Sequence, residues 1–163
     1  MPIAPGINII VAAARTALAG VQGVGPQVHN RPRWAKREAE LIELFFDPAS
    51  KKINEWSIEH RRGTDREMDY QFRWISQIEL VIRGLVAFDD SEDTFGFVNT
   101  QIDRVRHTFQ SNMIVFATPE LSQRGITSWE TALALAGSPS GSEYLVHAVE
   151  MNLQVEQISA ISV

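Results

Sequence analysis

Alternating apolar and polar side chains between residues 55 and 88 constrain the fold of this 163-residue chain most strongly. Trp56, Ile58 and His60 alternate with polar neighbours, which is typical of a strand with one buried face. The alternation resumes beyond residues 63–65, whose composition is that of a turn. The resumed series is Met68, Tyr70, Phe72 and Trp74. The two runs predict a β-hairpin that turns at residues 63–65.

The second run is unusually long. Ile78, Leu80, Ile82, Val86 and Phe88 keep the parity of Trp74, so the alternation spans residues 67–88. At ~3.3 Å per residue, these 22 residues would extend for about 70 Å, whereas a usual strand has about 5–6 residues. We therefore expect the strand to bend near Ser76, with a possible bulge at Gly84, or to project from the body and meet another subunit.

Amphipathic patterns predict helices on either side of the hairpin. Apolar residues recur at steps of three and four over residues 3–21, and Gly20 and Gly23 are expected to end this helix. The same spacing joins Phe95, Val98, Ile102, Val105 and Phe109. Asp89, Asp90 and Ser91 are suitable caps for this second helix, and Glu92 and Asp93 are favourable in its first turn. A short helix over residues 34–46, with Trp34 on its apolar face, is also expected.

The rest of the chain predicts further strands. We expect short strands at residues 27–30 and 113–116 and a strong final strand at residues 145–156. Residues 119–143 fit no single period, and residues 136–142 have the composition of a flexible loop. Because there is no internal repeat and no linker, residues 1–163 are expected to form one domain.

The sequence carries no recognisable catalytic or metal-binding motif. There is no cysteine, which excludes disulfides, thiolate catalysis and cysteine-bound metals. The four histidines are far apart, and no phosphate-binding or nucleophile motif occurs. The acidic cluster Asp89, Asp90, Glu92 and Asp93 could bind a divalent cation, but helix capping explains it. We therefore predict no catalytic residue, cofactor or metal. The apolar stretches are also too short to cross a membrane.

Charge is unevenly divided along the chain. Residues 1–84 carry 12 basic and 10 acidic side chains, a net charge of +2, whereas residues 85–163 carry 3 and 10, a net charge of -7. This division is either chance in a small sample or a surface with two different faces, which would orient a subunit on a partner. The overall charge of -5 argues against a protein that coats nucleic acid.

The order of these elements resembles the lambda-type tail terminator, or tail completion, proteins of long-tailed phages. The resemblance rests on the first helix, on the strand at residues 56–60, and on residues 75–88 followed by a helix that opens at residues 89–92. The final strand at residues 144–153 completes it. It covers most of the chain, although residues 34–52 and 119–142 match no element of the family.

The resemblance implies an α+β fold with a mainly antiparallel sheet and two main helices on one face. The long alternating segment predicts, in addition, a projecting β-hairpin. It also implies a structural protein rather than an enzyme, without a cofactor. Such proteins form a hexameric ring that caps the tail-tube protein, ends its polymerisation and joins the tail to a head–tail connector or neck protein. DNA would pass through the lumen without specific binding. The location would be the virion tail, assembled in the host cytoplasm.

Two alternatives remain open. The chain could be another ring-forming neck or tail-tube component. It could instead be a small α+β enzyme or ligand-binding domain, with the acidic cluster and His107 as its site. Within the first interpretation, Tyr70, Phe72 and Trp74 are candidate contacts to a neighbouring subunit or the tube. Asp89, Asp90, Glu92 and Asp93 are candidate lumen residues, because an acidic lining repels DNA phosphates.

Replacing Phe72 with Asp tests the predicted interface. We expect a folded subunit that fails to assemble, because a charge at the centre of an interface typically costs several kcal/mol. Circular dichroism and light scattering measure folding and assembly. Assembly of the variant would exclude the hairpin as the interface, and loss of folding would place Phe72 in the core.

Overall fold

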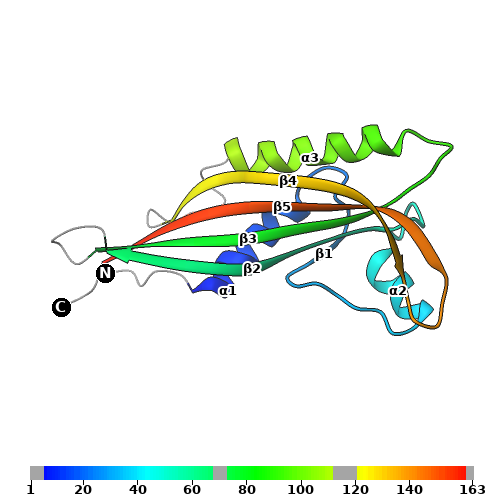
Figure 1. The fold of residues 1–163 in the computed structure, drawn as a ribbon, viewed down its shortest axis with the longest axis horizontal. Helices are drawn as coiled ribbons and strands as arrows, with labels where there is room; N and C mark the ends of the chain where they lie inside the picture. The colour runs from blue at the N-terminus through cyan, green and yellow to red at the C-terminus, as the bar shows by residue number, and fades with distance from the viewer. Residues whose placement is uncertain (1–5, 68–72, 112–120, 161–163) are drawn as a thin grey trace.

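Strand β3 (Arg73–Ala87) lies at the centre of a five-stranded sheet in the computed structural model, which describes residues 6–67, 73–111 and 121–160 (Figure 1). The other elements, in chain order, are α1 (Ile7–Ala19), β1 (Gln27–His29), α2 (Glu38–Phe45), β2 (Asn54–Glu67), α3 (Thr94–Ser111), β4 (Leu121–Gly137) and β5 (Glu143–Ala160). The strand order is β1-β2-β3-β5-β4, and β1–β2 is the parallel pair. This mainly antiparallel sheet with helices confirms the predicted α+β class.

One face of the sheet carries the main core. Ile78, Leu80 and Ile82 of β3 are buried on this face together with residues of both α1 and α3. The helices contribute Ile10, Ala14 and Leu18 from α1, and Val98, Ile102, Val105 and Phe109 from α3. The predicted placement of two main helices on one face is therefore correct, and four of the five apolar positions predicted for the second helix are buried.

The opposite face is covered at one end by α2. Leu41 and Phe45 of this helix pack with Ile53 and Val146 in a second, smaller core. The helix begins at Glu38 rather than Trp34, because the Glu40 carboxylate turns back to accept the Lys36 backbone N–H at 2.9 Å and closes the first turn. The expectation that Trp34 lies on the apolar face of a helix was wrong: this side chain is 87% exposed.

The hairpin exists, but its turn is not at residues 63–65. Strand β2 continues through Gly63, Thr64 and Asp65, which pair with Ile78, Gln77 and Ser76 of β3. Residues 68–72, between the end of β2 and the start of β3, lie outside the described residues. Strand β3 therefore has 15 residues, not 22. Strands β2, β3 and β5 continue past α1 and α3 toward one end of the molecule (Figure 1), so the described part of the hairpin projects beyond the helices.

The irregularity predicted on β3 lies on β2 instead. The register shifts between His60 and Arg62, whereas β3 pairs without interruption with β5 from Arg73 to Ala87. Gly84 is not a bulge. It lies opposite Trp56, and a Cβ atom at this position would lie 2.8 Å from the indole ring. The glycine is needed because the fully buried Trp56 side chain occupies the space above it.

Strand β4 was not predicted. Its register shifts between Gln123 and Gly125 and again between Ile126 and Ser128, and each shift interrupts the period-two pattern. The expected loop at residues 136–142 begins later, since β4 extends to Gly137. The strand predicted at residues 113–116 lies outside the described residues. The final strand is longer than predicted, but the parity of Val149, Met151 and Leu153 is correct.

Substitution of Gly84 with Ala tests the packing of Trp56. The added methyl group would overlap the ring, so we expect the free energy of unfolding to fall by about 1–3 kcal/mol. Gly63→Ala is the matched control in β2, because its Cβ would meet ordinary contacts at 3.8 Å. Urea denaturation measures both, and equal effects of the two substitutions would contradict the proposed packing.

Candidate functional site

Of the three predicted interface residues, the structure describes Trp74 alone. Tyr70 and Phe72 lie outside the described residues. Trp74 is half-buried on β3, between Glu67 of β2 and Ser159 of β5. By its parity it belongs to the face that carries the main core. Contact of these residues with another chain stays a prediction.

The predicted acidic cluster precedes α3 and makes local interactions. Asp89 and Glu92 both pair with the Lys52 ammonium at 3.1 Å. Asp89 also accepts hydrogen bonds from the side chain and backbone of Ser91, and these bonds, with Lys52, lower its pKa to about 2. The helix cap is Asp93, whose carboxylate accepts the Gly96 N–H at 2.8 Å. The expected caps Asp89, Asp90 and Ser91 were therefore wrong, and so was the placement of Glu92 and Asp93 in the first turn, because the helix begins at Thr94 and Asp93 caps it.

The acidic cluster and His107 do not form one site. His107 lies in α3, 14 residues after Asp93, which corresponds to about 20 Å along a helix at 1.5 Å per residue. Within residues 6–67, 73–111 and 121–160, no group of three His, Asp or Glu side chains is arranged to hold a metal ion. The geometry gives no support to an enzyme site built from these residues.

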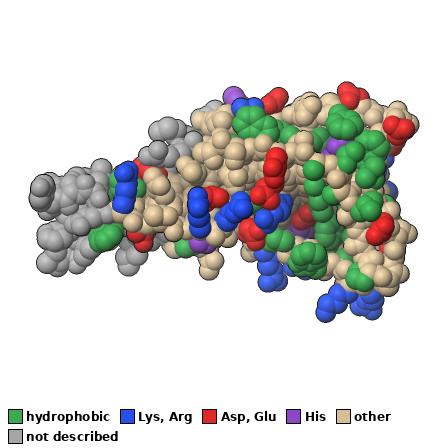
Figure 2. Space-filling model, viewed as in Figure 1, with side chains coloured by type: hydrophobic (Ala, Val, Ile, Leu, Met, Phe, Trp, Pro, Cys, Tyr) green, Lys and Arg blue, Asp and Glu red, His purple; other side chains and the backbone are tan. Residues whose placement is uncertain are grey.

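The sheet face opposite α1 and α3 carries a network of ion pairs. Arg83 of β3 pairs with Glu59 of β2 and with Glu150 of β5, the latter at 3.1 Å. Arg61 pairs with the same Glu150 at 3.3 Å, and Glu79 accepts from the neighbouring Arg62 at 2.9 Å. Figure 2 shows acidic and basic side chains side by side over the middle of this face. These ion pairs join β2, β3 and β5, so the paired residues are far apart in the sequence.

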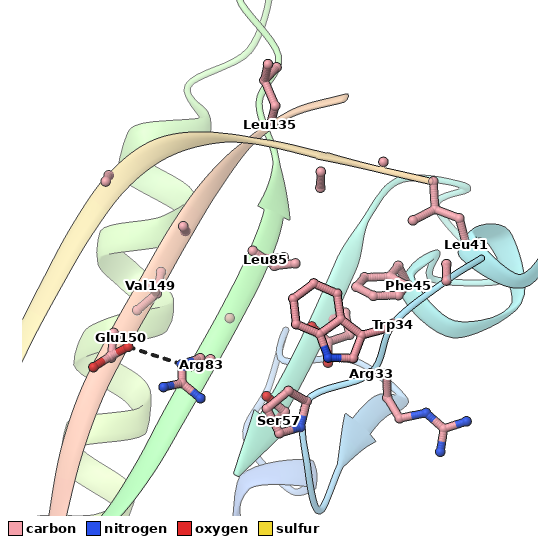
Figure 3. A pocket seen from close by; sticks show the side chains of 18 of the residues that line it. Arg33, Trp34, Leu41, Phe45, Ser57, Arg83, Leu85, Leu135, Val149 and Glu150 are labelled. Carbon is pink, nitrogen blue, oxygen red and sulfur yellow. Dashed lines mark hydrogen bonds and ion pairs between the residues drawn. The ribbon is translucent and has the colours of Figure 1, made fainter. Parts of the chain in front are cut away.

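A cavity of about 1030 Å³ lies on this face between the ion pairs and α2. Residues 32–35, α2 and the curved end of β4 form its sides, and β2, β3 and β5 form its floor. The apolar lining includes Trp34, Ala35, Leu41, Phe45, Leu85, Ala132, Leu135, Ala136 and Ala148. In the view of Figure 3 the Trp34 indole is drawn between Phe45 and Leu85, whereas Arg33 points away from them. Figure 3 also shows Arg83 turned toward Glu150.

Glu55 of β2 is the unusual residue of the cavity. The side chain lines the cavity, yet the residue is only 3% exposed. Its Oε1 atom has no hydrogen-bond partner among the described residues. Burial raises the pKa of this carboxyl from 4.5 to about 7, because the charged form loses its hydration. A buried carboxylate without a partner is costly, so it indicates either strain or a missing ligand.

Ser138 is a second unsatisfied group in the cavity wall. It follows β4 and is buried, and its hydroxyl oxygen also has no hydrogen-bond partner among the described residues. Buried polar atoms in folded proteins are nearly always paired. Two such atoms from distant parts of the chain therefore share one cavity.

A separate group of apolar side chains surrounds the buried His147. It consists of Phe95, Leu133 and Leu145, and we call it the His147 patch. Leu133 pairs with His147 across β4 and β5, and the ring centroids of Phe95 and His147 are 4.6 Å apart. All three patch residues are exposed. His147 itself bonds Thr94 Oγ1 at 2.9 Å, and burial lowers its pKa.

Neither the cavity nor the ion-pair network was predicted from the sequence. Glu55, Glu59 and Arg83 occupy positions that alternate with apolar residues, and this pattern indicates a solvated face. The partners of Arg83 are 24 and 67 residues away. The sequence does place both Glu and Arg at alternate positions of the hairpin strands. This pattern predicts ion pairs between the strands, but it does not predict which residues pair.

Comparison of the chain with protein-family models and with curated proteins gives no match. Among the described residues, no helix has the length and apolar character needed to span a membrane.

Replacing Glu55 with Gln tests the burial of the carboxylate. Since its pKa is about 7 in the folded protein and 4.5 in the reference state, the folded state binds the proton more tightly. Proton binding by Glu55 therefore stabilises the folded state. This contribution to the free energy of unfolding is complete below about pH 4.5 and is lost as the pH rises through 7. We therefore expect Glu55→Gln to raise the free energy of unfolding by about 1–2 kcal/mol at pH 8 and to change it little at pH 4. Urea denaturation at both pH values measures this, and an equal effect at both would exclude a raised pKa.

Proposed function

We propose that the protein is a ring-forming structural component of a phage tail, with tail termination as its role: it caps the tail tube, ends its polymerisation and joins the tail to the head or neck. The observation that best supports this is the presence of a long open strand at each edge of the sheet. The ring would be a hexamer, in line with the resemblance. The proposal requires neither catalysis nor a cofactor.

The first open edge belongs to β2. Its neighbour β1 pairs only with Glu55, Trp56 and Ser57. From residue 58 to residue 67, β2 has β3 on one side and no neighbouring strand on the other among the described residues. Arg61, Arg62 and Arg66 are exposed along this segment, and such charges prevent uncontrolled pairing of an open edge.

The second open edge belongs to β4, at the other side of the sheet. Within the described part of the chain β4 pairs only with β5, although it is 17 residues long. Trp129, Leu133 and Leu135 are exposed along it. Long apolar edges of this kind invite contact with another chain. The His147 patch extends the apolar surface from β4 to Phe95 at the start of α3.

Two different edges suit a ring better than a two-fold dimer. In a ring of identical subunits, one patch of each subunit contacts a different patch of the next. The open part of the β2 edge carries charges of both signs, whereas the β4 edge exposes apolar side chains and carries Glu130. The uneven charge of the two halves of the chain, +2 and -7, favours one orientation between neighbours. Asp89, Asp90, Glu92 and Asp93 remain our proposed lumen residues.

The same features suit other ring-forming components of a phage neck or tube. Such proteins would also need two complementary edges, so the open edges do not separate them from a terminator. The distinction depends on which protein the ring contacts. Addition of the purified ring to growing tail tubes would separate them, because a terminator stops elongation at one end and a tube subunit extends it.

Replacement of Leu133 with Asp tests the β4 edge as an interface. Leu133 is 50% exposed in the subunit, so the substitution should leave the subunit stable. In an interface, the buried charge should weaken association at least tenfold. Light scattering after size exclusion, over a range of concentrations, measures the mass of the assembly.

Ile9→Asp is the matched control, since Ile9 is 63% exposed on α1 and lies on neither edge strand. We expect the wild type and the control to increase in mass with concentration and Leu133→Asp to remain a monomer. A wild-type protein that stays monomeric at every concentration, or a Leu133→Asp variant that assembles normally, would overturn the proposed interface.

A further inference from the structure

We propose that the cavity beside α2 is a binding site for an organic ammonium group on an apolar stem, with Glu55 as its counter-ion and Trp34 as its aromatic cover. The proposal does not depend on ring formation. It follows from the size of the cavity, the unpaired carboxylate within it, the exposed indole at its mouth and the charge of its lining.

The cavity has the dimensions of a ligand site. Its volume of about 1030 Å³ is at the upper end of the range of about 300–1,000 Å³ that is common for small-molecule sites. Most of the lining is apolar, with a few polar groups that converge from different strands. This combination fits a ligand with an apolar body and one polar end.

Glu55 identifies the polar end of the ligand. Its carboxyl is buried, lines the cavity and leaves Oε1 without a hydrogen bond among the described residues. The nearest basic residue in the lining along β3 is Arg83, which is already paired with Glu59 and Glu150. A ligand that donates hydrogen bonds and carries positive charge would satisfy the carboxylate.

The charge of the whole lining favours a cation over an anion. The lining contains two arginines, Arg33 and Arg83, and four glutamates. The glutamates are Glu55, Glu130, Glu143 and Glu150. Arg33 points away from Trp34 and Leu85 (Figure 3), and Arg83 is already paired with Glu59 and Glu150. An anionic ligand would meet this excess of carboxylates directly and is therefore disfavoured.

Trp34 explains why the ligand should be an ammonium rather than a metal ion. The indole is largely exposed to solvent, yet it lines the mouth of the cavity next to Phe45. An exposed tryptophan at a mouth is a surface on which a ligand stacks, and ammonium groups are attracted to the face of an aromatic ring. A metal ion would gain nothing from the apolar walls, and in the described residues no set of three ligands is present.

Isothermal titration calorimetry at pH 8 with phenethylammonium tests the proposal. The neutral alcohol 2-phenylethanol is the matched probe, because it has a similar shape and no charge. We expect saturable binding of the amine by the wild type and at least tenfold weaker binding of the alcohol. Equal binding of both probes, or no binding of the amine, would overturn the proposal.

Variants assign the binding to the cavity. Glu55→Gln should weaken amine binding about tenfold, because the amide keeps the shape and loses the charge. Trp34→Ala should weaken it about threefold to tenfold. Glu92→Gln is the control, since it removes one exposed carboxylate that does not line the cavity. Unchanged binding in Glu55→Gln, with the amine still bound, would place the amine elsewhere and overturn the assignment.

The same ammonium chemistry could come from a free amine or from a lysine side chain of a partner protein. Titration with Nα-acetyl-lysine amide separates these sources. Binding of the lysine derivative as tightly as phenethylammonium supports a partner's lysine, and preference for phenethylammonium supports a free amine with a larger apolar body. Failure of both to bind would contradict the proposal.

Discussion

The pairing of β3 on both sides is the constraint on which the rest of this structure depends. Its 15 residues pair without interruption with β5, and residues 74–86 pair with β2. Because side chains alternate along a strand, this single element separates the molecule into two faces. Ile78, Leu80 and Ile82 lie on the face that packs against α1 and α3. Val81, Arg83 and Leu85 lie on the other face, which is only partly covered.

The partly covered face carries the groups from which we infer binding. There α2 packs at one end and leaves the middle of the sheet to ion pairs. Between these two regions, Glu55 is buried, and its Oε1 atom has no hydrogen-bond partner among the described residues. A chain selected only for stability would place an apolar residue at such a position, because replacement of an uncompensated buried charge is usually stabilising. The carboxylate therefore favours a role in binding, and the open edges favour a role in assembly.

Much of the fold was predictable from the sequence because its signals are local. The parity of Val149, Met151 and Leu153 and the spacing of the apolar residues in α3 were correct, since each depends on one element alone. The features that failed depend on contacts between distant segments. Residues 63–65 were expected to form a turn, but they continue to pair with β3. The need for glycine at position 84 is explained only by Trp56 on the neighbouring strand. Strand β4 was hidden by its two register shifts.

The candidate site was less predictable than the fold. Glu55 alternates with Trp56 like any outward-facing strand residue, and the cavity that it lines also takes residues from α2 and from the end of β4, about 80 residues later in the chain. A ¹³C NMR titration of the Glu55 carboxyl in the free protein tests the account most directly, with Glu55→Gln used to assign the resonance. We predict a midpoint near pH 7, because burial disfavours the charged form of the carboxyl. A midpoint near 4.5 would show a solvated or paired carboxylate and would contradict the account.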